Sequence, residues 1–216
     1  TIKLNKMKKH TINYTQLFNL FCEKEASWNY NFETPFKQDG FYYATDRHSL
    51  ISMPDKSELD FKELDKPNIE AILPTEFHPP IEIDIKELKQ KLIEKTPLVD
   101  EKKEEDKKCK ECDGDGYLEC DLGHEHDCHK CDGEGTVVCK ELTGNKIPDK
   151  EAVFKYRDFY LKQFELDRLV KACEMIGVNK IHKVAGIGTR SLYFKAGDFY
   201  ILVMACVNVG DRAIEL

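Results

Sequence analysis

Apolar and polar positions along the N-terminal part of the chain predict short helices and strands in alternation. Leucine and phenylalanine recur at helical spacing over residues 15–26, which indicates an amphipathic helix. Residues 41–45 are rich in aromatic and β-branched side chains, and an apolar run follows at 50–53 after a short polar turn, which predicts a β-hairpin. A further strand is expected at 81–85, followed by a helix at 87–94.

The C-terminal part of the chain has a similar pattern. It predicts a strand at 153–161, a helix at 165–176 and three strands at 181–184, 191–195 and 199–207. This order is β-α-β-β-β, and the N-terminal part can be read in roughly the same order. We therefore expect an α+β fold that is built from two related halves.

A highly charged segment lies between the two halves. Residues 100–108 are nine consecutive charged residues of both signs, a composition that is typical of a solvated connection or a helix extension. Turn-forming residues beyond residue 140 mark the return to the fold. The sequence thus predicts an N-terminal part of the body, a charged linker, an inserted module and a C-terminal part of the body, at residues 1–99, 100–108, 109–139 and 140–216.

The inserted module has the cysteine spacing of a metal site. Two copies of the pattern C-x-x-C-x-G-x-G begin at Cys109 and Cys128. Each pair of thiolates can converge on one ion, and two pairs supply the four tetrahedral sulfur ligands that structural zinc prefers. The glycines tolerate the positive φ that a tight reversal after each pair requires. We therefore expect one structural zinc ion and a reducing, cytoplasmic compartment. The expected ligands are Cys109, Cys112, Cys128 and Cys131.

Two further cysteines of the module allow a second metal site. Cys120 and Cys139 occupy equivalent positions in the two repeats, and the histidines His124 and His126 lie between them in the sequence. Together these four side chains can bind a second zinc ion. Alternatively, the cysteines are reduced thiols beside the return strands and the histidines face solvent. The sequence leaves both interpretations open.

The repeated pattern resembles the cysteine-rich region of DnaJ-type cochaperones over residues 109–135. That family normally has four copies of the pattern, whereas this chain has two. The resemblance therefore implies a single zinc-bound β-hairpin module. Because nothing in the sequence resembles a J-domain, it does not imply cochaperone activity.

Two segments of the body resemble bacterial DNA polymerase sliding clamps. Residues 41–50 are similar to the strand and turn that clamps carry as an Ala-Thr-Asp-Gly-His-Arg-Leu pattern, and residues 197–204 are similar to their final strand. Arg47 replaces the glycine of the pattern, Ser49 replaces its arginine, and Ala205 stands where the last strand usually has proline. The resemblance implies clamp-like β-α-β-β-β half-repeats and a link to DNA replication. Since the chain is about half as long as a bacterial clamp, it also implies a phage or mobile-element derivative.

The distribution of charge favours protein contacts over DNA contacts. The chain has a net charge of −7, and residues 109–139 hold nine acidic side chains and only two lysines, so the remainder is neutral. A ring that slides on DNA needs a positive inner face, which the candidate helices lack. We therefore expect a non-enzymatic zinc-binding interaction protein whose acidic hairpin contacts a protein partner with a basic surface.

Two other functions remain open on the sequence alone. One is a nucleic-acid-binding accessory factor of replication or transcription, with eight basic residues gathered on one face: Lys155, Arg157, Lys162, Arg168, Lys171, Lys180, Lys183 and Arg190. The other is an enzyme with an unrecognised site. We do not expect Asp46 and His48 to be catalytic, although they share one face of a strand. The sequence has no nucleotide-binding motif and no long apolar run. We therefore expect neither a small-molecule substrate nor a membrane partner.

Overall fold

The computed structural model describes residues 11–24, 32–55, 59–64, 69–74, 77–121, 123–187, 191–207, 209 and 212–216. The chain divides into two compact units. The first, which we call the body, comprises Thr1–Thr96 and Lys150–Leu216, and the second, which we call the arm, comprises Pro97–Asp149. The arm therefore includes the charged segments on both sides of the cysteine repeats. Among the residues that the structure describes, no helix has the length and apolar character needed to cross a membrane.

An eight-stranded sheet forms the centre of the body. Its strands are β1 (Phe36–Gln38), β2 (Phe41–Thr45), β3 (Ser49–Pro54), β4 (Lys62–Glu63), β5 (Ile81–Asp84), β12 (Lys180–Ile187), β13 (Ser191–Ala196) and β14 (Phe199–Met204). They lie in the order β4-β1-β2-β3-β14-β13-β12-β5. The two halves of the chain meet in the antiparallel pair of β3 and β14. A smaller sheet contains β11 (Phe159–Lys162), β10 (Val153–Tyr156) and β15 (Ile214–Glu215).

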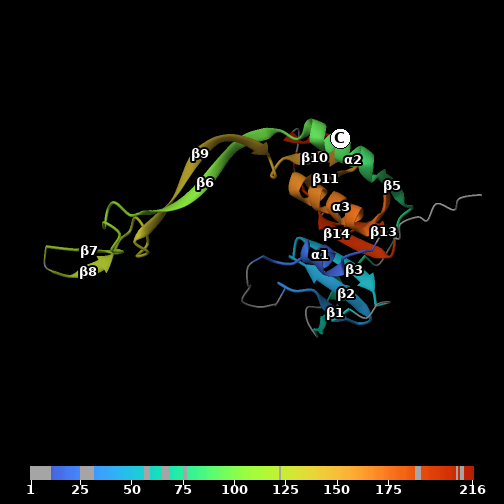
Figure 1. Ribbon diagram of the computed structural model, residues 1–216, viewed down its shortest axis with the longest axis horizontal. Helices are drawn as coiled ribbons and strands as arrows, with labels where there is room; N and C mark the ends of the chain where they lie inside the picture. The colour runs from blue at the N-terminus through green and yellow to red at the C-terminus, as the bar shows by residue number, and fades with distance from the viewer. Residues whose placement is uncertain are drawn as a thin grey trace, which may run out of the picture. The chain divides into compact units, whose positions relative to one another are not determined.

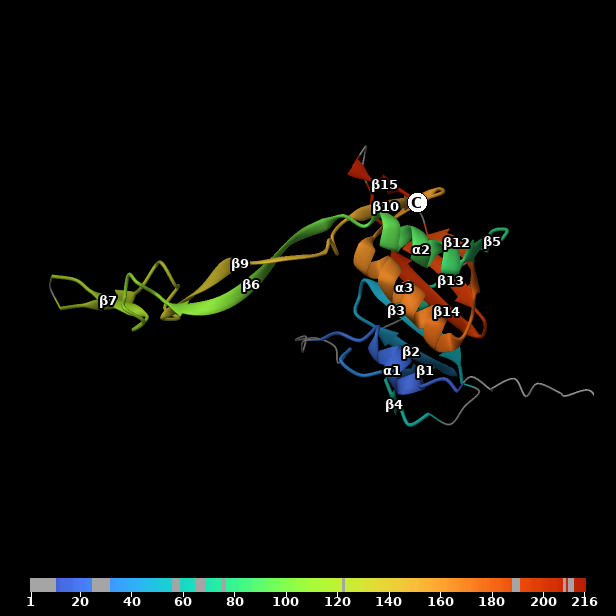
Figure 2. The same cartoon turned by 45° about the horizontal axis from the view of Figure 1, so that its top comes forward.

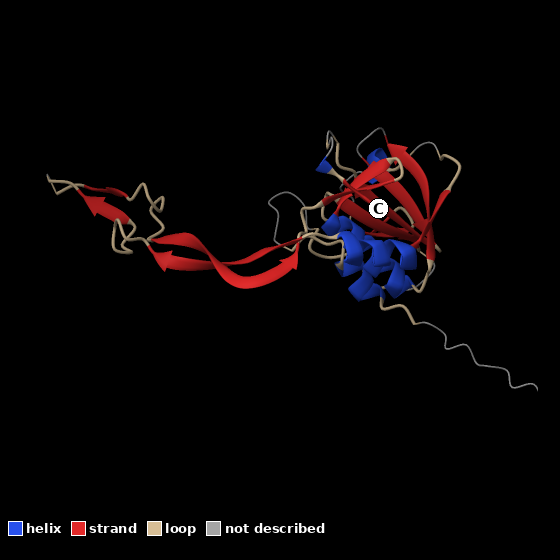
Figure 3. Ribbon diagram, turned by 90° about the horizontal axis from the view of Figure 1, so that it is seen from above, coloured by secondary structure: helices blue, strands red, loops and turns tan. Residues whose placement is uncertain are grey.

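Three α-helices cover one face of the large sheet (Figures 2 and 3). They are α1 (Tyr14–Asn19), α2 (Ile85–Lys95) and α3 (Gln163–Ile176), and a short 3-10 helix, η1, spans Ile69–Ile72. The Asp84 carboxylate caps α2 because it accepts hydrogen bonds from two amides of the first turn. Gly177 ends α3 in the left-handed conformation. The apolar sides of these helices bury the main core against the sheet.

Strand periodicity produces a second, smaller core on the opposite face of the sheet. Tyr42 and Ala44 of β2 point into the main core, whereas Tyr43 between them packs in the second cluster. In β14, Leu202 joins the second cluster while its two neighbours join the first. Both faces of the sheet are therefore covered, which explains why these strands read as continuous apolar runs.

Several predicted elements of the body are confirmed, and one prediction is wrong. The hairpin of β2 and β3, the helix α3 and the three strands that follow it lie where the sequence places them. The predicted single strand 153–161 is instead the hairpin β10–β11, because Arg157 takes a φ of 55° and reverses the chain. The N-terminal half has the order α-β-β-β over the described residues, and a strand before the helix would fall within residues 1–10, which lie outside them. Its helix α1 comes first and three antiparallel strands follow, as they do after α3.

The arm is a two-stranded ribbon with the cysteine repeats at one end. Strands β6 (Leu98–Lys108) and β9 (Thr136–Pro148) pair along their length, and β7 (Tyr117–Glu119) and β8 (Glu125–Asp127) form a hairpin beyond them (Figure 1). Residues 100–108 are therefore part of a largely exposed strand and not a helix extension.

Cross-strand charge pairs explain why this charged segment is a strand. Glu104 lies directly opposite Lys140 with an ion pair of 2.6 Å, and Asp100 lies directly opposite Lys146 with an ion pair of 2.7 Å. Opposite charges that face each other across an antiparallel pair stabilise it. The charges of both signs in residues 100–108 indicate solvation when taken alone. Once the return strand is present, they pair with opposite charges across the ribbon.

Candidate metal centre

The four predicted zinc ligands come together in the segment 109–135, which we call the cysteine head. Their side chains are buried, and all four Sγ atoms lie within 4.8 Å of one another. Cys109 Sγ is 3.9 Å from Cys128 Sγ, and Cys112 Sγ is 3.7 Å from Cys131 Sγ. Zinc–sulfur bonds of about 2.3 Å in a tetrahedron place the sulfurs about 3.8 Å apart. The four side chains therefore fit a zinc ion.

The two cysteine repeats hold each other through reciprocal backbone hydrogen bonds. The amide of Cys109 donates to the carbonyl of Gly135 at 2.8 Å, and the amide of Cys128 donates to the carbonyl of Gly116 at 2.8 Å. Each repeat thus aligns the first ligand of the other. The head is a pair of equivalent half-sites related by an approximate two-fold axis.

Backbone amides also point at the sulfurs. The amide of Gly116 donates to Cys112 Sγ, and the amide of Gly135 donates to Cys131 Sγ, both at 3.3 Å. Such donors stabilise thiolates, the form in which cysteine binds a metal ion. This arrangement agrees with a metal-bound thiolate cluster. A purely apolar cluster of thiols would not need these amide donors.

The last glycine of each repeat allows the close approach of the two repeats. A Cβ atom on Gly116 would lie 2.3 Å from the carbonyl oxygen of Gly133, and one on Gly135 would lie 2.3 Å from that of Gly114. Both residues also have positive φ, 84° and 73°. Glycine is therefore required twice over at these positions, by the backbone conformation and by the contact.

The thiols of the cluster differ in how readily they lose a proton. Burial acts to raise the pKa of Cys112, but hydrogen bonds from the Gly116 and Gly114 amides and from neighbouring thiols outweigh it and lower the pKa to about 7. Burial raises the pKa of Cys131 to about 12. One thiolate in the cluster opposes the formation of a second beside it. A divalent cation lessens this conflict, because its two positive charges offset part of the negative charge of the thiolates.

The residues predicted for a second metal site are not gathered with one another in the described part of the chain. Cys120 follows β7, and its amide donates to the carbonyl of His124 at 3.0 Å across the hairpin turn. Cys139 lies in β9 opposite Glu105, and His126 lies in β8 opposite Leu118. The one potential ligand group among the described residues is the four-cysteine cluster. A second zinc ion at Cys120, Cys139, His124 and His126 stays a prediction.

The surface of the cysteine head is acidic and largely uncompensated. All nine of its acidic side chains are exposed. Among the described residues, only Asp113 has an ion-pair partner, at 3.8 Å from Lys108. Glu119 and Glu125 lie directly opposite each other in the hairpin, where like charges are destabilising. The sequence shows the acidic composition of the head, but it does not show that these carboxylates lack ion-pair partners.

The basic residues proposed for a nucleic-acid surface are mostly neutralised by carboxylates. Lys155, Lys162, Arg168, Lys180 and Lys183 each form an ion pair of 2.6 to 2.7 Å with an aspartate or glutamate. A sixth member of that set, Arg190, lies outside the described residues. An ion-paired cation has less charge to offer a phosphate, so these five residues favour a nucleic-acid surface less than their number suggests, and that alternative stays a prediction.

Asp46 has a structural role in the body, and its carboxylate contacts the backbone amide of His48. Its Oδ1 accepts hydrogen bonds from the backbone amides of His48 and Ser49, and its Oδ2 forms an ion pair of 2.7 Å with Arg168. Arg168 also stacks against the ring of Phe21. The carboxylate therefore fixes the β2–β3 turn to helix α3.

A buried carboxylic acid beside Arg168 was not signalled by the sequence pattern. Glu165 is 3% exposed, and its Oε2 has no hydrogen-bond partner in the described part of the chain, with Arg168 3.6 Å away. Burial raises the pKa of Glu165 to about 7, against the attraction of Arg168. The group is thus protonated more readily in the folded state than in the unfolded state.

This shift predicts how stability depends on pH. Because the folded state binds the Glu165 proton more tightly, the free energy of unfolding falls as pH rises from about 4.5 to 7 and is level above that range. We expect Glu165→Gln to raise the free energy of unfolding by on the order of 3 kcal/mol at pH 8 and to give no gain near pH 4. Denaturant titrations at several pH values check this. The exposed neighbour Asp167→Asn is the control, and parallel pH profiles for parent and Glu165→Gln would contradict it.

Comparison with known proteins gives structural neighbours but no sequence relatives. No protein-family model matches the chain, and no curated protein matches it in sequence. The DNA polymerase III subunit beta of Pseudomonas aeruginosa has a TM-score of 0.46 and 11% identity, over 95% of this chain and 69% of that chain. The beta clamp of Helicobacter pylori bound to a DNA ligase peptide has a TM-score of 0.47 and 11% identity, over 90% of this chain and 62% of that chain.

A third neighbour, the DNA polymerase sliding clamp of Bacillus subtilis, has a TM-score of 0.44 and 13% identity, over 96% of this chain and 67% of that chain. The chain is thus weakly similar in structure to sliding clamps. With scores below 0.5, these neighbours do not establish the family or the function of the chain. The DnaJ-type resemblance and a phage or mobile-element origin stay predictions.

Proposed function

We propose that the chain is a non-enzymatic, zinc-binding interaction protein whose acidic cysteine head docks onto a basic surface of a protein partner. The observation that carries the proposal is the set of eight exposed carboxylates in the head without an ion-pair partner among the described residues. The four buried cysteines fix the backbone that presents them. A rigid surface of one charge is suited to select and orient a partner of the opposite charge.

The contrast between the ribbon and the head supports this interpretation. In the ribbon, Glu104 and Asp100 each face a lysine across the strands and form short ion pairs with it. In the head, Glu119 faces Glu125 instead. The ribbon carboxylates Glu104 and Asp100 are therefore compensated, whereas Glu119 and Glu125 in the head face each other without compensation. A partner with basic side chains would relieve the repulsion in the head.

A structural rather than catalytic role for the metal follows from the ligand set. Cys109, Cys112, Cys128 and Cys131 supply four sulfur ligands, which completes the tetrahedral coordination of zinc. A catalytic zinc ion keeps an open position for water or substrate. The metal would thus hold the head in shape, and the carboxylates around it would make the contacts. A link of this docking role to DNA replication stays a prediction of the sequence resemblance.

The proposal predicts a partner interaction that depends on salt and on the head. We expect a partner isolated from cells with the tagged full chain to be released as ionic strength rises from about 0.1 M to 0.5 M, since salt screens exposed charges. A variant with three neutralised carboxylates, Glu119→Gln, Glu125→Gln and Asp127→Asn, should recover at least tenfold less of that partner.

A matched variant controls for net charge alone. Glu33→Gln, Asp39→Asn and Asp60→Asn neutralise three exposed carboxylates of the body, and we expect it to recover the partner like the parent chain. Recovery that is insensitive to salt, or equal loss with both variants, would contradict the docking role of the head.

A further inference from the structure

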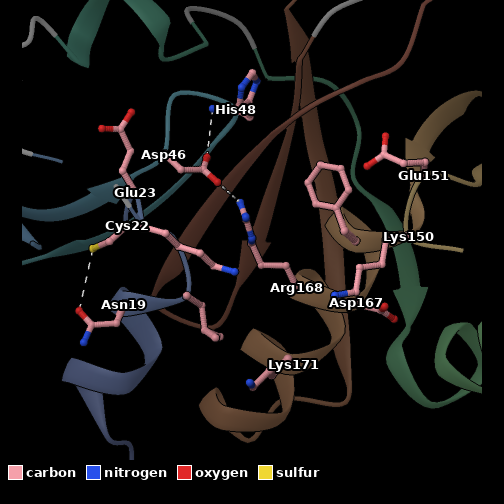
Figure 4. Close-up of a pocket in the computed structure, with 13 residues that line it drawn as sticks. Asn19, Cys22, Glu23, Asp46, His48, Lys150, Glu151, Asp167, Arg168 and Lys171 are labelled. Carbon is pink, nitrogen blue, oxygen red and sulfur yellow. Dashed lines mark hydrogen bonds and ion pairs between the residues drawn. The ribbon is translucent and has the colours of Figure 1, made fainter. Parts of the chain in front are cut away.

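A pocket in the body lies between α1, the β2–β3 turn, α3 and residues 150–151 (Figure 4). Its volume is about 960 Å³, within the range of roughly 300 to 1,000 Å³ that is usual for ligand pockets. Phe164 and Leu20 contribute apolar surface to it, and Arg168 lies within it, directed at Asp46. We call this pocket the lysine groove, because three lysines line it: Lys24, Lys150 and Lys171.

The carboxylates of the lysine groove are already engaged. Asp46 is bound to Arg168 at 2.7 Å, and Glu23 is bound to Arg47 at 2.9 Å. Glu151 is bound to Lys162 at 2.6 Å. The fourth carboxylate, Asp167, accepts a hydrogen bond at 2.9 Å from the neutral amide of Gln163.

The three lysines, in contrast, are exposed and have no ion-pair partner among the residues that the structure describes. Among the described charged groups of the groove without an ion-pair partner, there is thus one carboxylate, Asp167, and there are three lysine ammonium groups. The groove has an excess of positive charge although the body as a whole carries a net charge of only +1. A ligand with several negative charges fits it best.

The cysteine head presents a surface of matching chemistry. Tyr117 and Glu119 lie on one face of β7, and their direct partners in β8 are Asp127 and Glu125. These four side chains are exposed on one face of the hairpin, which we call the acidic face, while Leu118 points the other way and packs on the cysteine cluster. Tyr117 is 47% exposed and adds an apolar ring to the carboxylates.

We propose that the lysine groove of one chain binds the acidic face of the cysteine head of a second copy. The inference rests on the proposed docking role of the head and names its partner. The acidic face places three carboxylates opposite three lysines, and its tyrosine offers the groove's Phe164 and Leu20 an apolar contact. Aromatic side chains beside charged groups are common anchors of interfaces.

The separation of charge between head and body favours this contact. The head carries a charge of −7, whereas the body that receives it carries +1 and is positive at the groove. The contact joins two different surfaces. If two chains exchange heads reciprocally it closes a symmetric dimer, and otherwise it builds longer assemblies.

Sedimentation velocity of the zinc-loaded full chain tests the proposal. At about 20 mM salt we expect the weight-average mass to rise with protein concentration, and at about 500 mM salt we expect a monomer. Lys150→Glu with Lys171→Glu should weaken the association at least tenfold. Lys86→Glu with Lys95→Glu, a matched double charge reversal on α2 outside the groove, should leave it within twofold.

A charge swap separates the contact from a general effect of charge. Glu119→Lys with Glu125→Lys in the head should also prevent self-association, and an equimolar mixture of this variant with Lys150→Glu, Lys171→Glu should associate again. A parent chain that is monomeric at all concentrations and salt levels, or a mixture that fails to associate, would overturn the proposal. If a separate partner is still recovered through the head, the proposed function stands and the identity of its partner as a second copy is wrong.

Discussion

Loss of one cysteine ligand is expected to unfold the arm and leave the body folded. Cys128→Ser should abolish zinc binding, and with it on the order of 10 kcal/mol of metal-derived stability. The head has little else to hold it, because Leu118 and Val137 are the only further apolar side chains in the described part of the chain that pack against the four cysteines. The ribbon of β6 and β9 is two-stranded, and isolated two-stranded sheets are marginal in water.

Amide hydrogen exchange on the full chain measures this effect unit by unit. In Cys128→Ser, we expect protection to disappear within residues 109–135 and to stay unchanged in α3 and β14. Cys120→Ser is the matched control, because this cysteine lies in the same head but outside the cluster. If Cys128→Ser keeps its protection in the head, the cysteines are not a metal-dependent framework.

The second large effect is expected for Gly116→Ala. The added methyl group would lie 2.3 Å from the backbone carbonyl oxygen of Gly133, so the two repeats must move apart. We expect zinc affinity to fall by roughly a hundredfold, which corresponds to about 3 kcal/mol. Competition with a chromogenic zinc chelator measures this directly.

Gly144→Ala separates the close contact from the cost of the backbone conformation. Gly144 has a φ of 82°, close to that of Gly116, but a Cβ atom there would have nothing within 4 Å. Both substitutions cost about 1 to 2 kcal/mol for a left-handed conformation. Only Gly116→Ala should weaken zinc binding beyond that cost, and equal affinities for the two variants would mean that the contact between the repeats is unimportant.

Local sequence signals predicted the parts of the structure that depend on local chemistry. The two C-x-x-C pairs bring four thiols within 4.8 Å because each pair is fixed by a tight turn and the repeats are equivalent. Helix α3 and strands β12, β13 and β14 follow from strong periodicity and from turns with glycine. Such signals are contained within a window of about a dozen residues.

Signals that depend on distant partners could not be read in the same way. The charged run 100–108 becomes a strand only because residues 136–148 return beside it with the complementary charges. Arg157 reverses the chain between two short apolar runs, 153–156 and 159–161, that can be read as one strand. The lysine groove is assembled from residues between 19 and 171 of the chain, and it depends on which carboxylates are engaged elsewhere.

The zinc content of the purified chain tests the central claim most directly. Elemental analysis should give one zinc ion per parent chain, the same ratio for Cys120→Ser, and none for Cys109→Ser. A ratio of two would bring Cys120, Cys139 and the histidines in as ligands of a second ion. No zinc in the parent chain after purification and reconstitution with zinc would contradict the account.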